Sequence, residues 1–227
     1  QRMRRVILFA LMASLYLPLH LTAGSFELFG LGRPVIPATA ASLGRGGVGI
    51  STSDSITINL TNPALLSAIR FAGIEVGFRG NYVQNNAKTQ TEAREDFDYG
   101  VMKFPVTRKG GFAFGAYPIM KSAASYLVSN SVENSSIQNE GQLYALFLGG
   151  AYQILPSLSL GMMMEAIAGN YQFETILNFA DSSMTDARLT RRNGFDGRRI
   201  NLGLTFAPVR KLQFGLAYST MLSGSRQ

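Results

Sequence analysis

The feature that most constrains this sequence is a strict alternation of apolar with small or polar residues near its C-terminal end. Apolar residues occupy every second position over 200–206 and again over 212–218, and Pro208 lies in the short connection between the two runs. A period of two residues is that of a β-strand with one apolar face, because successive side chains of a strand point to opposite faces. Two such runs joined by a tight connection predict a β-hairpin.

Comparable segments recur along the chain before this hairpin. We expect five further strands, at 72–85, 97–105, 111–121, 141–154 and 157–173. Short connections that contain a proline alternate with long polar connections, which we expect at 85–96, 122–140 and 174–198. Short turns alternating with long loops are typical of outer-membrane barrels, and strands of about ten residues cross a bilayer when tilted.

The pattern therefore predicts an all-β fold, an antiparallel transmembrane β-barrel. Lipid cannot satisfy backbone N–H and C=O groups, so a sheet that crosses a membrane has to close on itself. The apolar face would meet lipid, and the face that carries Glu75, Arg79 and Glu165 would meet the lumen as solvated or paired wall charges. Seven strands is an odd number, whereas bacterial single-chain barrels have even numbers. We thus expect residues 71–227 to be the first part of a longer barrel.

The composition excludes much of enzyme chemistry. The chain has no cysteine, and its one histidine, His20, lies in a segment that we expect to be removed. A chain without either residue cannot form a Ser-His or Cys-His pair or a histidine zinc site. We expect no enzymatic activity, no metal and no cofactor. The net charge of +7 comes from scattered Lys and Arg residues, so we expect no nucleic-acid partner.

The first segment has the layout of a secretory signal peptide. Arg2, Arg4 and Arg5 precede an apolar run over 6–19, and the small residues of 22–24 form a cleavage site before Ser25. An uncleaved anchor is the alternative reading of the same run. We interpret residues 1–24 as the signal peptide of an exported protein, and the barrel pattern then predicts that the mature protein lies in the outer membrane of a bacterial cell.

The segment 25–70 does not alternate and is rich in turn residues. Gly44, Gly46, Gly47 and Gly49 formally satisfy the dinucleotide-binding pattern GxGxxG. That site needs a strand before the glycines and a helix after them, whereas a polar run follows here. The pattern favours a compact segment in which glycine permits close backbone approach.

One stretch of this segment resembles a known family. The run "SLGRGGVGISTSDSITINLTNPALLSAI", followed at once by an amphipathic strand, resembles the N-terminal hatch of the FadL/TodX family of outer-membrane transporters. The family pattern is a glycine cluster, an acidic residue and Asn-Pro-Ala, which maps onto Gly44, Gly46, Gly47, Gly49, Asp54, Asn62, Pro63 and Ala64. The stretch "GGFAFGAYPIMKSAASY" also looks like the third strand of that family.

The resemblance implies a fourteen-stranded monomeric barrel, of which about seven strands are present, with residues 25–70 as a hatch inside it. It also implies passive uptake of long-chain fatty acids or other hydrocarbons. The partners would be outer-membrane lipid and a hydrophobic small-molecule ligand, which would leave sideways through the barrel wall.

Three groups of residues are candidates for that activity. Asn62, Pro63 and Ala64 would fix the hatch turn, either as a gate or only as a rigid turn. Pro118 cannot donate to a strand ladder, so it would kink the strand into a lateral opening, unless the strand simply ends at Tyr117. Phe26, Leu28 and Phe29 would line the ligand pocket or pack inside the lumen.

Other functions remain open at this point. The shuttle barrels of type IX protein secretion share the plan of a hatch within a barrel, so a role as a secretion partner is the main alternative. A general water-filled porin is a third reading, although a stable hatch would block its pore. An outer-membrane lipase is the least favoured, because the mature chain would lack histidine.

Overall fold

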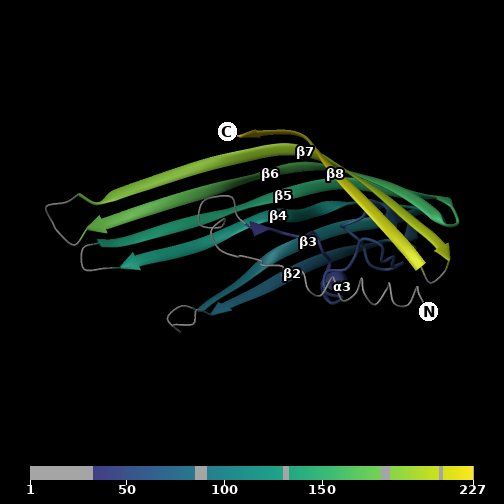
Figure 1. Cartoon of the computed structure of the whole chain (residues 1–227), viewed down its shortest axis with the longest axis horizontal. Helices are drawn as coiled ribbons and strands as arrows, with labels where there is room; N and C mark the ends of the chain where they lie inside the picture. Colours follow the sequence, from purple (N-terminus) through teal and green to yellow (C-terminus); the bar gives the residue numbers. More distant parts are fainter. Residues whose placement is uncertain (1–32, 85–90, 130–132, 180–184, 210–211, 227) are drawn as a thin grey trace, which may run out of the picture.

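A computed structural model describes residues 33–84, 91–129, 133–179, 185–209 and 212–226. Seven antiparallel strands follow one another in sequence order and form a single curved sheet (Figure 1). They are β2 (Gly73–Gln84), β3 (Thr91–Thr107), β4 (Gly110–Ser129), β5 (Glu133–Leu155), β6 (Leu158–Phe179), β7 (Ala187–Val209) and β8 (Leu212–Arg226). The expected all-β antiparallel class is confirmed. Among the described residues the sheet is open, with β2 and β8 at its edges.

The strands are longer than the sequence pattern predicts. β4 to β7 have 20 to 23 residues each, and the long polar loops expected at 122–140 and 174–198 are mostly strand. That expectation was wrong because polar side chains indicate exposure to water and not the absence of a strand. The backbone of a segment with polar side chains pairs in a sheet as well as the backbone of an apolar segment. Since about ten tilted residues span a bilayer, roughly half of each of these strands extends beyond it.

Most of the described residues before β2 lie against one face of the sheet, and the short strand at their start pairs with β4. We call residues 33–70 the inner segment; it contains β1 (Arg33–Pro34), helix α3 (Ala40–Leu43) and the 3-10 helix η1 (Pro63–Ala68). Ile58, Leu66 and Ile69 of this segment are buried in one cluster with strand residues that include Tyr117 and Met163. The hydrophobic core therefore lies between the inner segment and the inner face of the sheet.

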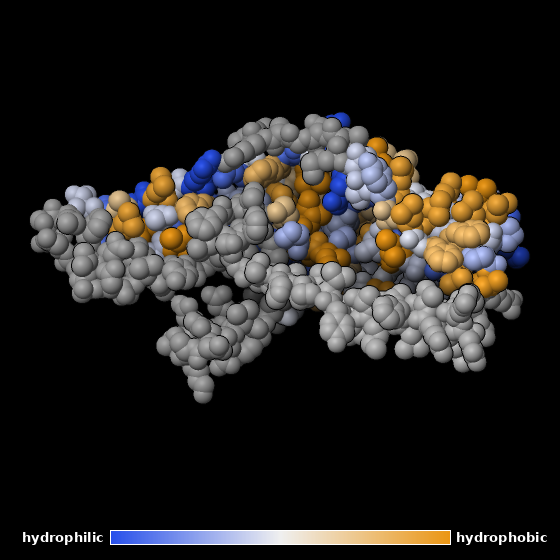
Figure 2. All heavy atoms as spheres, in the orientation of Figure 1, coloured by the Kyte–Doolittle hydropathy of each residue, from blue (hydrophilic) through white to orange (hydrophobic). Residues whose placement is uncertain are grey.

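The opposite, outward face of the sheet is apolar and exposed. Phe78, Leu146 and Leu216 are 76%, 62% and 63% exposed. Figure 2 shows apolar side chains gathered most densely toward the end of the sheet that carries the short turns. A large exposed apolar face marks contact with a membrane or with another protein. No helix in the described ranges is long and apolar enough to cross a membrane.

Candidate functional site

A row of small residues crosses five strands of the inner face and receives the inner segment. Successive cross-strand partners in this row are Gly111, Ala151, Gly161, Gly203 and Ala217. A Cβ atom on Gly203 would lie 2.2 Å from Oδ1 of Asn62, and one on Gly161 would lie 2.4 Å from the backbone nitrogen of Ala64. The missing side chains thus make the space that the Asn-Pro-Ala turn fills.

Asn62 fastens this turn to the sheet. Its side-chain Nδ2 donates to the backbone oxygens of Ile50 at 2.7 Å and of Leu204 at 3.2 Å, and its Oδ1 accepts from the backbone N–H of Ala64 at 3.0 Å. Pro63 follows at the first position of η1, where its missing N–H costs nothing. The three residues therefore form a buried part of the inner segment that packs against β6 and β7. A gating role for them stays a prediction.

The glycine cluster forms a turn after α3. Gly46 and Gly47 have φ angles of 75° and 78°, in the left-handed region that favours glycine. Gly44 caps the end of α3, and the backbone oxygen of Gly49 accepts from Nδ2 of Asn59 at 2.6 Å. These contacts are those of a compact turn, and no helix opens after the glycines as a dinucleotide site requires.

Asp54 organises the next loop of the inner segment. The backbone N–H of Ile56 donates to it at 2.8 Å and the hydroxyl of Thr57 at 2.7 Å. These two hydrogen bonds hold the pKa of Asp54 below its ordinary value of 3.8. The carboxylate thus has a local structural role in the loop.

This lowered pKa predicts an acid-sensitive contribution to stability. The stabilisation by Asp54 is fully present above the pKa of the unfolded chain and is lost as the pH falls through the lower, folded-state pKa. Urea unfolding between about pH 6 and about pH 3 should therefore show a smaller loss of stability for Asp54→Asn than for the parent protein. Glu140→Gln, at an exposed position of β5, is the matched control and should follow the parent. Parallel curves for Asp54→Asn and the parent would contradict this role.

A buried polar network ties three strands together on the inner face. Glu165 on β6 accepts hydrogen bonds from the hydroxyl of Tyr117, Nε of Arg199 and Nδ2 of Asn201. Nη2 of Arg199 also donates to the Tyr117 hydroxyl at 3.3 Å. The Glu165 side chain has no exposed area. The alternation of apolar and polar residues in the sequence placed Glu165 on this face correctly, but the partners of Glu165 could not be identified from the sequence.

The other two charges expected on the inner face are also paired. Glu75 accepts from the backbone N–H of Ile58 at 3.0 Å and forms an ion pair with the buried Lys103. Arg79 pairs with Asp98 at 2.7 Å. Glu75 therefore links the inner segment to β2 and β3, so these charges serve the packing of the inner face.

Pairing between β3 and β4 stops part-way along the strands. The last pair is Gly100 with Ala116, and beyond it Figure 1 shows β2 and β3 diverging from β4. β1 takes the vacated edge, with Arg33 opposite Lys121. We call the gap between 91–99 of β3 and 117–129 of β4 the β3–β4 seam.

Pro118 lies at the base of this seam. β4 pairs with β5 on both sides of it, with a register shift between Pro118 and Met120. The alternative that the strand ends at Tyr117 is therefore wrong, and a local irregularity lies where the proline predicted one. Whether this irregularity is the expected ligand exit depends on the protein family to which the chain belongs.

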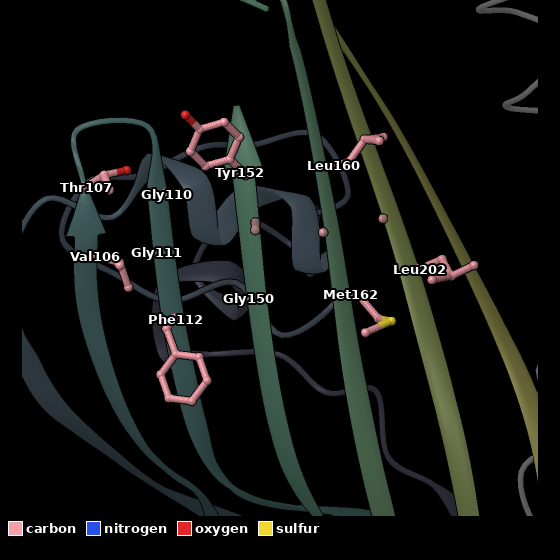
Figure 3. Close-up of a pocket in the computed structure, with 13 residues that line it drawn as sticks. Val106, Thr107, Gly110, Gly111, Phe112, Gly150, Tyr152, Leu160, Met162 and Leu202 are labelled. Carbon is pink, nitrogen blue, oxygen red and sulfur yellow. The ribbon is translucent and has the colours of Figure 1, made fainter. Parts of the chain in front are cut away.

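A hollow in the apolar surface lies on the outward face of the sheet. Figure 3 shows Phe112, Tyr152, Met162 and Leu202 around it, with the inner segment on the far side of the strands. The groove has a volume of about 690 Å³ and is hollow where Gly150 leaves no side chain. It is a notch in the apolar surface and not a pocket inside the barrel wall. Phe26, Leu28 and Phe29, expected to line an inner ligand pocket, lie outside the described residues.

The sequence matches a family model named BamG over residues 2–226, nearly its whole length. The chain belongs to the BamG family. No curated protein matches it. Among solved structures it is similar to Ail, the attachment invasion locus protein of Yersinia pestis, with a TM-score of 0.31 and 12% identity over 68% of this chain and 90% of Ail.

The BamG match corrects the expectation of a FadL/TodX transporter. Passive uptake of fatty acids or hydrocarbons, a hydrophobic ligand as partner and a ligand exit at Pro118 are all withdrawn with it. The secretion-shuttle alternative does not agree with this family either. The misleading residues have a physical explanation: the glycines and Asn62-Pro63-Ala64 serve turns and close packing, which do not depend on what a barrel transports.

The family and the sheet together identify this BamG protein as an outer-membrane β-barrel protein. The coarse prediction of location is therefore confirmed. The signal peptide expected at residues 1–24 lies outside the described residues.

Proposed function

We propose that this protein is a subunit of the machinery that assembles outer-membrane proteins, the Bam complex. The observation that carries the proposal is the BamG match over residues 2–226. Its partners would be other subunits of that complex, with outer-membrane lipid around the apolar outward face. The chain would contribute binding surfaces and no enzymatic activity.

The inner face supports a structural subunit better than a conduit. Asn62, Glu75 and Glu165 are each held by several hydrogen bonds or ion pairs, and the inner segment fits closely on glycines of the sheet. Moving this segment would break many contacts at once. We infer that residues 25–70 act as a fixed plug of a barrel that begins with residues 71–227, and that partners bind its outside.

Co-purification of the full-length protein from its native bacterium tests the proposal. A tagged copy extracted in mild detergent should bring the central assembly barrel with it in near-stoichiometric amount, as measured by quantitative mass spectrometry. Depletion of the protein should lower the amounts of other outer-membrane barrels. A tagged outer-membrane barrel of comparable size is the control, because it shows how much assembly barrel co-purifies only through crowding in the membrane. The proposed function is wrong if the protein brings down no more of the assembly barrel than the control barrel does, and if depletion of the two proteins has the same effect on other outer-membrane barrels.

A further inference from the structure

We infer that the hollow on the outward face binds one anionic glycerophospholipid of the periplasmic leaflet. An acyl chain of the lipid would lie in the hollow, and its phosphate would lie at the basic turn formed by Arg108 and Lys109. We call this hollow the outward groove; its apolar lining includes Val106, Phe112, Tyr152, Met162 and Leu202. The inference concerns a lipid site of this chain and does not depend on membership of the Bam complex.

A missing side chain makes the outward groove. One cross-strand row of the outward face consists of Phe104, Phe112, Gly150, Met162, Leu202 and Tyr218. Gly150 is the one member of this row without a side chain. A Cβ atom added to Gly150 would lie 3.6 Å from the backbone oxygen of Gly111 and 3.9 Å from Cδ2 of Phe112, so the space above it is open. The groove is therefore a gap in an otherwise apolar row.

The lining of the outward groove suits an acyl chain. Its volume of about 690 Å³ lies within the range of about 300–1,000 Å³ that is usual for ligand pockets. None of the described residues that line it is charged. The groove lies at the end of the sheet that carries the short turns, where apolar side chains gather on the outward face (Figures 2 and 3). A hollow in a membrane-facing surface is filled from the bilayer, whose interior consists of acyl chains.

A basic turn lies directly beside the outward groove. Thr107 and Gly110 line the groove, and Arg108 and Lys109 connect them as the turn from β3 to β4 (Figure 3). The N–H of Lys109 donates to Oγ1 of Thr107 at 3.1 Å, and the N–H of Gln153 donates to the backbone oxygen of Lys109 at 2.7 Å. Both basic residues are exposed, and within the described ranges neither belongs to an ion pair. Two cations thus lie next to an apolar groove.

The charges near the short turns favour an anionic headgroup. Residues 100–119, 145–164 and 200–219 form the parts of β3 to β8 near these turns, and they contain no Asp or Glu. Clusters of Lys and Arg near a membrane surface attract anionic lipids. The short turns of outer-membrane barrels are periplasmic, so the headgroup belongs to the leaflet that consists of phospholipid. The groove and the turn together therefore fit an anionic phospholipid better than a zwitterionic one.

Fluorescence quenching by brominated lipid tests the site. The chain has no tryptophan, so Phe112→Trp places a fluorophore in the groove of the full-length protein, prepared without other tryptophans. Bromine quenches tryptophan only near contact. In phosphatidylcholine vesicles, brominated phosphatidylglycerol should be preferred over brominated phosphatidylcholine about tenfold at this position. At Tyr218→Trp, which does not line the groove, the preference should stay within about twofold.

Two substitutions in the turn test the headgroup contact. Arg108→Gln with Lys109→Gln should lower the preference measured at Phe112→Trp to about twofold or less, because the anionic phosphate loses both cations. Arg191→Gln with Arg192→Gln is the matched control, since both residues are exposed on β7 away from the short turns. This control should keep the tenfold preference. Equal effects of the two double substitutions would overturn the role of the turn.

Filling the hollow tests the acyl-chain contact separately. Gly150→Leu places a side chain in the groove and should also lower the preference to about twofold or less, although the basic turn is intact. Ala168→Leu, at an exposed position of β6 that does not line the groove, is the control and should keep the preference. A full preference in Gly150→Leu would show that the groove is not part of the site and would overturn the inference.

The same fluorophore identifies other occupants. Equal quenching by the two brominated lipids at Phe112→Trp would show general lipid contact only and would overturn the inference. Stronger displacement by lipopolysaccharide than by unbrominated phosphatidylglycerol would overturn it too, because that lipid belongs to the cell-surface leaflet. In the native complex the preference should persist, whereas loss of quenching on assembly would show that a protein fills the groove. Failure to co-purify with the assembly barrel would contradict the proposed function alone, because the lipid preference is measured on the isolated protein.

Discussion

Replacing Gly203 by alanine is expected to unseat the inner segment. The new Cβ atom would lie 2.2 Å from Oδ1 of Asn62 and 2.6 Å from the backbone nitrogen of Ala64, so the turn has to move and its hydrogen bonds to β7 weaken. Overpacking of this kind costs about 1–3 kcal/mol. The free energy of unfolding in lipid vesicles, measured with urea, should fall by that amount. Trypsin should also cleave faster after the exposed Arg45 of the inner segment.

Gly150→Ala is the matched control for this experiment. Gly150 lies on the outward face of β5, and its Cβ atom would meet its nearest neighbours at 3.6 Å and 3.9 Å, which is ordinary contact. Its unfolding free energy should stay within about 0.5 kcal/mol of the parent. Equal effects of the two substitutions would show that the glycine row does not seat the inner segment.

Replacing Glu165 by leucine is expected to have the larger effect. The change leaves the Arg199 guanidinium, whose side chain is 22% exposed, beside the Tyr117 hydroxyl and the Asn201 amide without their common acceptor. Removing one partner of a buried ion pair costs about 3–5 kcal/mol. Because Arg199 retains some contact with solvent, we expect a loss of about 3 kcal/mol in the free energy of unfolding.

A double substitution separates the isolated charge from the lost packing. Replacing both partners of a buried ion pair by apolar residues is often neutral or stabilising. Glu165→Leu with Arg199→Leu should thus recover most of the stability that Glu165→Leu loses. If the double variant is no more stable than Glu165→Leu, the stability lost in Glu165→Leu comes from lost packing and not from the isolated charge of Arg199. Glu140→Gln, at an exposed position of β5, controls for the loss of a negative charge.

Local periodicity explains why much of the sheet could be predicted. The alternation over 200–206 and 212–218 places the last hairpin correctly, and β2 at Gly73–Gln84 agrees with the expected 72–85. The phase of the alternation also places Glu75 and Glu165 on the inner face. These features depend only on which residues neighbour each other along a strand, which the chain shows directly.

Where polar residues fill both faces of a strand, the same reasoning fails. Residues 174–198 read as a loop because their hydropathy does not alternate, yet β6 and β7 pair through them. Beyond the membrane both faces of a strand can meet water, so no apolar period remains to be recognised. The family resemblance failed for a related reason, since glycine clusters and Asn-Pro-Ala report a type of close packing and not a substrate.

The sequence by itself determined the β class, the phase of each apolar strand, the absence of cysteine chemistry and the turn-rich character of residues 33–70. Only the tertiary structure decided that Gly203 makes room for Asn62, which is 141 positions away, that Tyr117 and Arg199 share Glu165, and that β3 leaves β4 beyond Ala116. The physical reason is that strand periodicity is a property of neighbours along the chain. Close packing, shared hydrogen bonds and the divergence of paired strands arise only when distant segments meet.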